Sequence, residues 1–534
     1  MGFYRMIRIF CDSCYEYVTG EKIGHCKSLN HDFTEEKVQN TDSDKLFLQF
    51  TKDKIHRTVI DQSDSSKVYV TVSIKDDVYE NMDVQSKKFV DYIGYAFFKQ
   101  YEKILSSDVI EKLLNMVRVE AIYNESTPHE QIFQRCATSD TRICYDLADG
   151  KRNVVLIEDD FESLTNQRIT ENLPIFIRTN TTSEVPAPIY DETNRLGELC
   201  DMLRMGNDPV FPIHLVTEFI SHIATPIMVI VGQEGSAKST KTALIKMLVD
   251  TSGNSIKDQL IAFPKNVEDI INNMANRYFV GYDNVSWISP AQSDTLCVSV
   301  TGGSVPTRKL YSNFDEISVS YQRKIIMDGI TINADSGDLA RRSISYFTDR
   351  IPDTERLTLQ SILSWFKSIQ AELLGEIFTI LKNAMKILDE VRSDTPAIPD
   401  MADFTIWGEA ISRAMGNEKG KFVEEYKKKL ETNSEILNES NPAVQFFTEA
   451  LGESPSLELP ISMWFTKLES YADANGTDKR SRNYPKNSNK IRGWIERSKP
   501  ILFKSGLEIE IYQSSGTKFK KNNTILNVKK VGTL

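Results

Sequence analysis

The chain has 534 residues, which is too long for one compact core, so its length predicts three or four domains. With 40% hydrophobic and 26% charged residues it has the composition of an ordinary soluble globular protein. Its net charge of -11 excludes a polycation that coats nucleic acid along its whole length.

The sequence also lacks signals for export or membrane insertion. Its start, MGFYRMIRIF, has no apolar run of the length that a secretory signal needs. The most apolar run, Ile227–Val231, is far too short to span a bilayer. Seven cysteines without a regular framework agree with a reducing compartment. We therefore expect a cytoplasmic protein that has no membrane partner.

The first 35 residues hold a candidate zinc site. Cys11 and Cys14 have the CxxC spacing that places two thiolates on one side of a tetrahedral ion. Cys26 and His31 supply a second pair of ligands, and His25 can replace either of them. A Zn²⁺ ion bound by four such ligands would be structural, and this spacing resembles a zinc ribbon. The alternative is a small apolar patch of free thiols, because only one pair has the CxxC spacing.

Residues 36–194 are predicted to form an α+β domain. Val68–Ile74 alternates as a strand does, residues 89–122 have the pattern of helices, and residues 130–190 are mainly of β type. Thr179–Thr193 is rich in Thr, Pro and Asn and predicts a linker. The remaining cysteines, Cys136, Cys144, Cys200 and Cys297, are expected to be ordinary buried residues.

Residues 195–353 alternate between helix and strand in the manner of an α/β core, and their strongest motif is a Gly-rich loop. Ile227–Val231 predicts a buried parallel strand before this loop, and TALIKMLV predicts an amphipathic helix after it. Strand, loop and helix in this order are the context of an ATP-binding P-loop, whose backbone N–H groups surround the phosphates. The loop comprises Gly232, Gln233, Glu234, Gly235, Ser236, Ala237, Lys238, Ser239 and Thr240.

Within this loop, Lys238 is expected to reach the β- and γ-phosphates of ATP, and the Ser239 hydroxyl to ligate Mg²⁺. Ala237 stands where the motif has its second glycine, and Gly235 can relieve the crowding there. The alternative is a Gly-rich turn that holds no ligand.

A second apolar strand, Tyr278–Tyr282, ends in Asp283, which has the place of a Walker B acid holding the Mg²⁺ ion. The next residue is Asn284, where most such motors carry an acid that orients or deprotonates the attacking water. An amide can orient water but cannot accept a proton. Three alternatives remain. In the first, Asn284 positions the water while a nearby acid such as Asp294 is the base, and in the second, positioning of the water by Asn284 alone suffices. In the third, hydrolysis is slow and the protein is an ATP-gated DNA clamp. We favour active hydrolysis, because the other parts of the motif fit.

A third strand, Lys324–Met327, ends in Asp328, only 96 residues after Gly232. Between the second and third strands, the segment TGGSVPTRKLY at Thr301–Tyr311 resembles the additional motif of superfamily 3 helicases, closest to the primase-helicases of satellite phages and poxviruses. The chain departs from that family at two positions. Ser304 stands where an Asp is usual, and Asp328 stands at the sensor 1 position, where Asn is usual.

The resemblance implies a ring-shaped motor. In this family the segment forms a hairpin that projects basic residues, here Arg308 and Lys309, onto single-stranded DNA in a central channel. The run DLARR, which ends in Arg341 and Arg342, resembles the arginine-finger segment. A finger supplied by a neighbouring subunit requires a homo-oligomer, by resemblance a hexamer. For Arg308 and Lys309 the alternative is a solvated hairpin without a DNA contact. For Arg341 and Arg342 the alternative is a pair of surface ion pairs.

Residues 354–440 are predicted to be helical, with one break at Asp394–Asp400. Beyond them the chain becomes basic, since Asp478–Lys530 contains fourteen Lys/Arg and four Asp/Glu, a net charge of +10. A helix at Lys490–Ser498 precedes strands at Leu507–Tyr512 and Thr524–Val528, an order that suggests a winged helix.

Duplex DNA is the expected partner of this basic region, with the helix in the major groove and the wing on phosphates. The cations of the wing are Lys518, Lys520 and Lys521, and Lys479, Arg480 and Arg482 precede the helix. The aromatic residues Tyr484 and Trp494 are expected to pack rather than stack on bases.

The predicted fold is an α/β P-loop ATPase core of AAA+-like type with an N-terminal α+β region, a helical region and a C-terminal winged-helix-like domain. The predicted segments are 1–35, 36–194, 195–353, 354–440 and 441–534. The function predicted is an ATP- and Mg²⁺-dependent DNA helicase or translocase that replicates a virus, plasmid or integrated element. The alternative is an ATP-switched DNA-binding scaffold or initiator with little hydrolysis.

Overall fold

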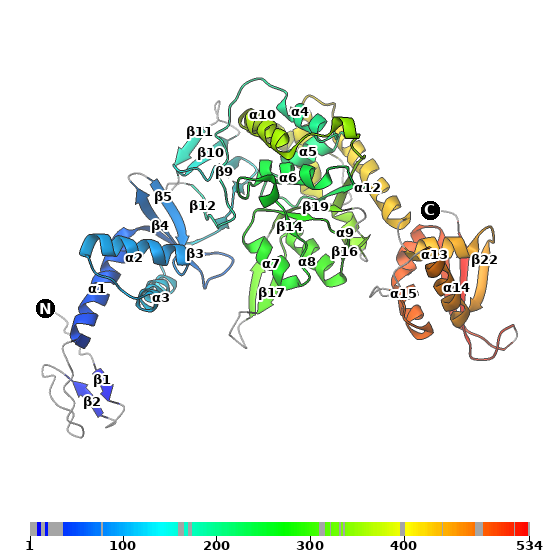
Figure 1. Cartoon of the computed structure of the whole chain (residues 1–534), viewed down its shortest axis with the longest axis horizontal. Helices are drawn as coiled ribbons and strands as arrows, with labels where there is room; N and C mark the ends of the chain where they lie inside the picture. Colours follow the sequence, from blue (N-terminus) through cyan, green and yellow to red (C-terminus); the bar gives the residue numbers. More distant parts are fainter. Residues whose placement is uncertain are drawn as a thin grey trace. The chain divides into compact units, whose positions relative to one another are not determined.

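The structure is a computed structural model of the chain, and contacts divide it into two compact units, Met1–Ile132 and Phe133–Leu534 (Figure 1). The residues described are 8–11, 16–19, 36–75, 78–158, 165–168, 173–308, 316–320, 322–329, 333–334, 337–395, 401–439, 442–475, 484–516 and 518–531.

The first unit is an α+β fold in which helices pack on one face of a mixed sheet. Its sheet has the order β5-β4-β3-β6, and Val68, Val70 and Val72 alternate along β4 so that all three face the same apolar core. Phe89 and Ile93 of α2 and Leu114 of α3 close this core. The elements are β1 (Arg8–Cys11), β2 (Glu16–Thr19), α1 (Glu36–Lys54), β3 (Ile55–Asp61), β4 (Val68–Lys75), β5 (Val78–Asp83), α2 (Lys87–Tyr101), α3 (Ser107–Tyr123) and β6 (His129–Glu130). The predicted strand at Val68–Ile74 and the helices within 89–122 are confirmed.

The second unit begins with an antiparallel meander of order β11-β10-β9-β8. Its strands are β8 (Cys136–Thr138), β9 (Arg142–Asp146), β10 (Asn153–Glu158) and β11 (Thr165–Arg168), flanked by β7 (Ile132–Phe133) and β12 (Ile175–Phe176). The division of the chain thus falls at residue 132, whereas the sequence placed a domain boundary at residue 194. The physical reason is packing, because Ile143 and Tyr145 lie in the same apolar core as Leu244 and Leu248 of the helix that follows the Gly-rich loop.

The predicted linker Thr179–Thr193 contains no helix or strand, but it packs closely. Val185 is buried, and the Ile189 N–H donates a hydrogen bond of 2.9 Å to the carbonyl of Ala371. A side chain at Gly375 would overlap the Ile189 carbonyl, so only glycine lets this segment approach the helix at that point. This stretch is therefore part of the core rather than a spacer.

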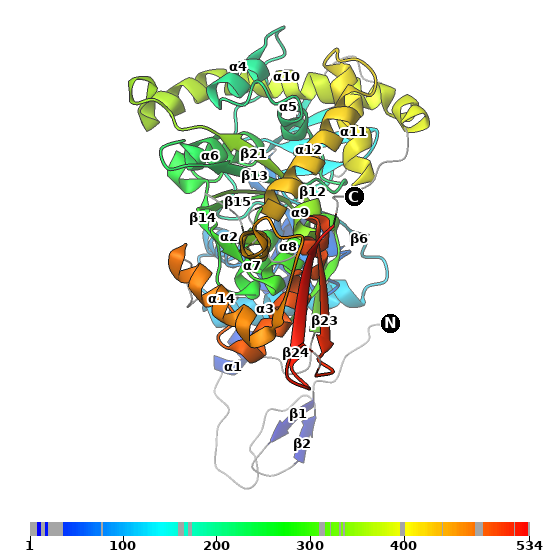
Figure 2. The same cartoon turned by 90° about the vertical axis from the view of Figure 1, so that its right-hand side faces the viewer.

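A five-stranded parallel sheet of order β14-β15-β19-β13-β21 forms the centre of the second unit (Figure 2). Met228 and Ile230 of β13 face one apolar core together with the helix α6, while Ile227 and Val229 face a second core with α7 and α8. Burial of both faces explains why the predicted strands were uninterrupted apolar runs. The strands are β13 (Ile227–Gly232), β14 (Ile261–Ala262), β15 (Phe279–Asp283), β19 (Lys324–Gly329) and β21 (Ser343–Thr348).

Helices cover both faces of this sheet, and short elements connect them. The helices are α4 (Arg195–Met202), α5 (Phe211–Thr217), α6 (Lys238–Val249), α7 (Val267–Ala275), α8 (Pro290–Thr301) and α9 (Gly337–Arg341). The short elements are η1 (Ile256–Asp258), β16 (Trp287–Ile288), β17 (Ser304–Arg308), β18 (Glu316–Ser320), β20 (Asn333–Ala334) and η2 (Asp353–Glu355). The predicted α/β pattern of residues 195–353 is confirmed.

Three helices follow the sheet: α10 (Leu359–Asp394), α11 (Ala402–Ala414) and α12 (Lys421–Glu439). Figure 2 shows α10 running across the top of the view, above α6. The predicted break is confirmed, since α10 ends at Asp394 and α11 begins at Ala402. Phe378, Trp407 and Tyr426 join the core that contains α6, so the three helices pack as part of the α/β body.

The C-terminal elements are α13 (Pro442–Leu451), β22 (Ser456–Pro460), α14 (Ile461–Ala474), α15 (Ser488–Lys504), β23 (Leu507–Gln513) and β24 (Thr524–Lys530). They have their own core, in which the Trp464 indole donates a 3.0 Å hydrogen bond to the Leu526 carbonyl. The predicted helix and both strands are present, and β22 adds a third strand, giving the order β22-β24-β23. Within the described ranges, none of the helices combines the length and apolarity needed to cross a bilayer.

Candidate nucleotide site

The Gly-rich loop connects the end of β13 to the start of α6, as its sequence predicts. A side chain at Gly232 would lie 2.5 Å from Ser236 Oγ and 2.7 Å from the Thr348 carbonyl oxygen, so no larger residue fits there. Ser236 is fully buried, and its hydroxyl has no hydrogen-bond partner in the described part of the chain. The loop is therefore closely packed from behind and carries an unsatisfied polar group.

Ala237 has a left-handed backbone with φ 57° and ψ 28°, directly before the first residue of α6. This conformation is open to glycine and costs other residues about 1 kcal/mol or more, because Cβ crowds the following carbonyl. This backbone conformation explains why the P-loop motif usually has its second glycine at the position of Ala237. Gly235, with φ 83°, takes the same region without strain and does not relieve Ala237.

Three polar residues of the predicted site meet at the ends of neighbouring strands. Asp328 lies on β19 beside β13, and its Oδ1 accepts hydrogen bonds from Ser239 Oγ at 3.2 Å and from the Asn284 N–H at 3.1 Å. Burial, together with the nearby negative charge of Asp283, raises the pKa of Asp328 to about 6. The carboxylates of Asp283 and Asp328 therefore face a common space.

The side chains in this space fit a magnesium ion. Asp283 Oδ1 and Asp328 Oδ2 are buried and have no hydrogen-bond partner among the described residues. Together with the Ser239 hydroxyl they form a set of hard oxygen ligands, which Mg²⁺ prefers. No group of three or more His, Cys, Asp or Glu suited to a metal occurs in the described part of the chain. Mg²⁺ sites need only one or two carboxylates, because nucleotide phosphates and water complete the coordination.

Asn284 and Asp283 line the same hollow. Asn284 has a left-handed backbone, with φ 53°, and an exposed side chain. Together with Asp283, Phe263 and Trp287 it lines a cavity of about 610 Å³. Asp294, proposed from the sequence as a base, is exposed on α8 and is not among the residues that line this cavity.

Arg341 and Arg342 both contact Asp338. Arg341 Nη2 lies 3.4 Å from Asp338 Oδ1, and Arg342 makes the closer ion pair with the same carboxylate. Within a single chain these contacts are the surface ion pairs that the sequence analysis gave as the alternative to an arginine finger. Arg341 keeps an exposed side chain, and a role in a neighbouring subunit stays a prediction.

The predicted hairpin has both of its arms in the structure. β17 pairs with β18 from Ser304–Ser320 to Arg308–Glu316 in antiparallel register. Lys309 and the tip of the hairpin lie outside the described residues, and Arg308 is described only in its backbone.

Other candidate ligands and cations are less completely described. Cys14, Cys26 and His31 lie outside the described residues, and Cys11 is described only in its backbone, so the zinc site stays a prediction. In the C-terminal region, Lys518, Lys520 and Lys521 lie between β23 and β24, as predicted, and Lys518 Nζ pairs with Glu458 at 2.6 Å. Lys479, Arg480 and Arg482 lie outside the described residues.

Two expectations about unreactive residues are confirmed. Cys136, Cys144, Cys200 and Cys297 are buried and free, and burial raises the pKa of the Cys297 thiol to about 11. Trp494 lies in the C-terminal core with its ring 6.1 Å from that of Phe447, in agreement with packing.

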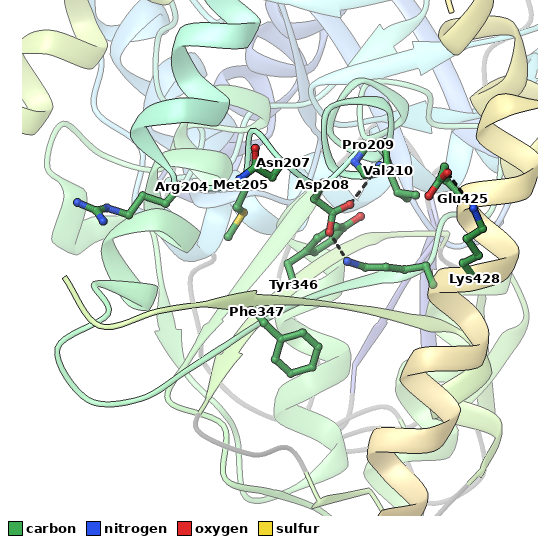
Figure 3. A pocket seen from close by; sticks show the side chains of 11 residues that line it. Arg204, Met205, Asn207, Asp208, Pro209, Val210, Tyr346, Phe347, Glu425 and Lys428 are labelled. Carbon is green, nitrogen blue, oxygen red and sulfur yellow. Dashed lines mark hydrogen bonds and ion pairs between the residues drawn. The ribbon is translucent and has the colours of Figure 1, made fainter. Parts of the chain in front are cut away.

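The structure adds a feature beside the loop that no motif signalled. A hollow of about 370 Å³ lies between the segment 204–210, β21 and α12 (Figure 3). Asp208 and Lys429 form an ion pair on one wall, and Phe347 is half exposed on another. Since Phe347 is the register partner of Val231, this hollow adjoins the strand that leads into the loop.

The sheet and the helices on its two faces form an α/β fold, and comparison with known proteins adds a biological context. Residues 196–430 match the family described as actinomycete integrative conjugative element replication protein, and residues 443–532 match the family described as AICE RepA C-terminal domain. Over these ranges the chain is similar to replication proteins of mobile elements. No curated protein matches it in sequence.

Solved structures show only remote likeness. The SCCmec type IV Cch active helicase has 10% identity and a TM-score of 0.43, over 89% of this chain and 93% of that chain. The NrS-1 C-terminal region in its A-form apo structure has 12% identity and a TM-score of 0.36, over 91% of this chain and 99% of that chain.

Proposed function

We propose that the protein is an ATP-dependent DNA helicase or translocase of superfamily 3 type, with an AAA+-like core, that acts in the replication of an integrated mobile element. The observation that carries the proposal is the pair of unsatisfied carboxylate oxygens of Asp283 and Asp328 beside Ser239, at the end of a P-loop strand. The family matches over residues 196–430 and 443–532 support the replication context.

The proposed roles follow from position. Lys238 neutralises the β- and γ-phosphates, and Ser239 and Asp283 hold the metal. Mg²⁺ supplies positive charge that stabilises the transferring phosphoryl group. Asp328 links β19 to the loop through Ser239, so it can report the state of the nucleotide to the strand next to β13. The hollow beside β21 is the place proposed for the base and ribose, because it adjoins the strand that leads into the loop and is lined by Tyr346 and Phe347.

DNA contacts are proposed for two regions. The β17–β18 hairpin carries Arg308 and Lys309 toward single-stranded DNA, in a homo-oligomer that we propose to be a hexamer. The C-terminal region has the order helix, strand, two helices and hairpin, which supports a winged-helix-like domain for duplex DNA. Lys520 and Lys521 are the exposed cations of its wing.

A second candidate is an ATP-switched DNA-binding scaffold that hydrolyses little. Asn284 favours it, because this exposed amide stands where a base is expected and cannot accept a proton. The helicase and the scaffold would both bind ATP, and they differ in the rate at which they hydrolyse it.

The proposal is tested by measuring steady-state phosphate release from ATP with and without single-stranded DNA. The proteins compared are wild type, Lys238→Ala and the control Lys386→Ala, which changes an exposed lysine of α10. A helicase predicts DNA-stimulated release that Lys238→Ala abolishes and Lys386→Ala leaves unchanged. Tight ATP binding without stimulated release supports the scaffold, and loss of neither activity in Lys238→Ala contradicts both.

A further inference from the structure

A segment that no motif marks passes directly beside the P-loop. Residues 349–358 connect β21 to α10, and the Ile351 N–H donates a 3.1 Å hydrogen bond to the Gly235 carbonyl. This bond fixes the segment to the middle of the loop, whose backbone would enclose the phosphates of a bound nucleotide.

The segment brings two guanidinium groups to the loop. A methyl group placed on Gly235 would lie 3.2 Å from Arg356 Nη2 and 3.7 Å from Arg350 Nε. Gly235, whose φ is 83°, thus lies beside two arginines of the same chain.

The two arginines differ in their partners. Arg356 pairs with Asp353 at 3.0 Å, an exposed contact of the kind that contributes little in water. Arg350 is exposed, and among the residues that the structure describes it has no ion-pair or hydrogen-bond partner. An unpaired arginine at this distance from the loop is available to a ligand.

Further cations lie near the loop, together with the carboxylates Asp349, Asp353 and Glu355 of the same segment. Lys241, one turn into α6, is buried and hydrogen-bonded to Thr348. Burial, together with the positive charge of Arg204, lowers the pKa of Lys241 to about 8. Arg204 pairs with Glu355 and Arg356 with Asp353, so Arg350 is the one of these three guanidinium groups that has no ion pair among the described residues and is free to stabilise an anionic ligand.

We propose that Arg350, assisted by Arg356, binds the phosphates of the nucleotide held by the P-loop of its own chain. The proposal rests on the nucleotide binding proposed above. A guanidinium matches phosphate geometry with two parallel N–H···O bonds, and it stays charged at all working pH values. Arg356 would exchange Asp353 for phosphate when the nucleotide binds.

This assignment differs from a finger supplied by another subunit. Arg341 and Arg342 are both paired with Asp338 and belong to a different segment. Arg350 acts within one chain, so its contribution to affinity is present at protein concentrations where no oligomer forms.

Equilibrium binding of Mg-ATP and Mg-ADP to the full chain tests the proposal, at protein concentrations below those at which sedimentation detects an oligomer. Arg350→Ala is expected to weaken Mg-ATP binding about tenfold, which corresponds to about 1.4 kcal/mol. Arg350→Lys keeps the charge but loses the fork, so it should recover only part of the affinity. The matched control Lys386→Ala removes an exposed cation of α10 and should bind as wild type does.

Melting without nucleotide separates binding from loop architecture. The proposal expects Arg350→Ala to melt as wild type does in the absence of nucleotide and to gain less stability when Mg-ATP is added. Unchanged Mg-ATP affinity, or a lower melting temperature in the nucleotide-free protein that accounts for the weaker binding, overturns it. If neither wild type nor Lys238→Ala binds Mg-ATP, the proposed function itself fails. If wild type binds and Lys238→Ala does not, an unaffected Arg350→Ala overturns this inference alone.

Discussion

Replacing Asp328 by asparagine should make the nucleotide-free protein more stable at neutral pH. Asp328 is fully buried beside Asp283, and its pKa is raised from 3.8 to about 6. Such a rise corresponds to about 2–3 kcal/mol of stability lost when the group ionises in the folded state. The amide introduced by Asp328→Asn would keep an acceptor for Ser239 and Asn284, and its N–H could donate to the unsatisfied oxygen of Asp283.

The sign of the pH dependence follows from proton binding. Between about pH 4 and pH 6 folded Asp328 binds its proton more tightly than the unfolded chain does, so this group lowers stability as the pH rises through that window. Above the window the loss is complete. The stabilisation by Asp328→Asn should therefore be near zero at about pH 4 and reach its full size above about pH 6.5.

The assay measures the free energy of unfolding by urea, without nucleotide or Mg²⁺, at about pH 4.5 and about pH 7.5, because most of the pH dependence falls between these values. The control is Asp191→Asn, which changes an exposed aspartate. Added Mg²⁺ should stabilise wild type more than Asp328→Asn, because the variant lacks one carboxylate of the site. A difference between variant and wild type that does not change with pH, or a variant less stable at the higher pH, would refute the reasoning.

The other predictions concern four separate features. Ala237→Gly should relieve its left-handed backbone, raising stability by about 1 kcal/mol without weakening ATP binding; lower stability in thermal unfolding would contradict this. Gly375→Ala should destabilise by about 1–3 kcal/mol through overlap with Ile189, and equal stability would show that the segment can move aside. Asn284→Ala should strongly reduce phosphate release and spare ATP binding, a pattern that unchanged turnover would exclude. Removing residues 442–534 should weaken duplex binding and flatten its salt dependence while ATP binding persists, as filter binding at several salt concentrations would show.

Much of the sheet could be predicted because its strands are buried on both faces. Ile227–Val231 and Ile325–Met327 are apolar runs that end at Gly232 and at Asp328-Gly329, and this pattern depends only on local sequence. The polar residue at the end of each run could also be placed, because the carboxyl ends of parallel strands meet at one edge. Strand order was not predictable, and it is strand order that brings Asp328 beside Ser239.

Features that depend on packing between distant segments left no local signal. Tyr145 alternates in a strand as any half-buried residue would, and nothing nearby shows that its partners are on α6 and α10. Arg350 and Arg356 follow β21 in a polar stretch that has the composition of an ordinary loop. The hydrogen bond between Ile351 and Gly235, and the approach of both arginines to Gly235, show that this stretch adjoins the P-loop.

Three departures from the expected motif meet at one site, and together they bear on what the site does. Ala237 and Asn284 both have left-handed backbones, each at a cost on the order of 1 kcal/mol, and burial, together with the nearby charge of Asp283, raises the pKa of Asp328. A bound Mg²⁺ would relieve the repulsion between the carboxylates, so nucleotide binding and stability should rise together. Asn284 supplies no proton acceptor at the position where most such motors carry an acid. The geometry thus favours tight Mg-nucleotide binding more strongly than fast turnover, and the ratio of these two quantities separates a motor from a switch.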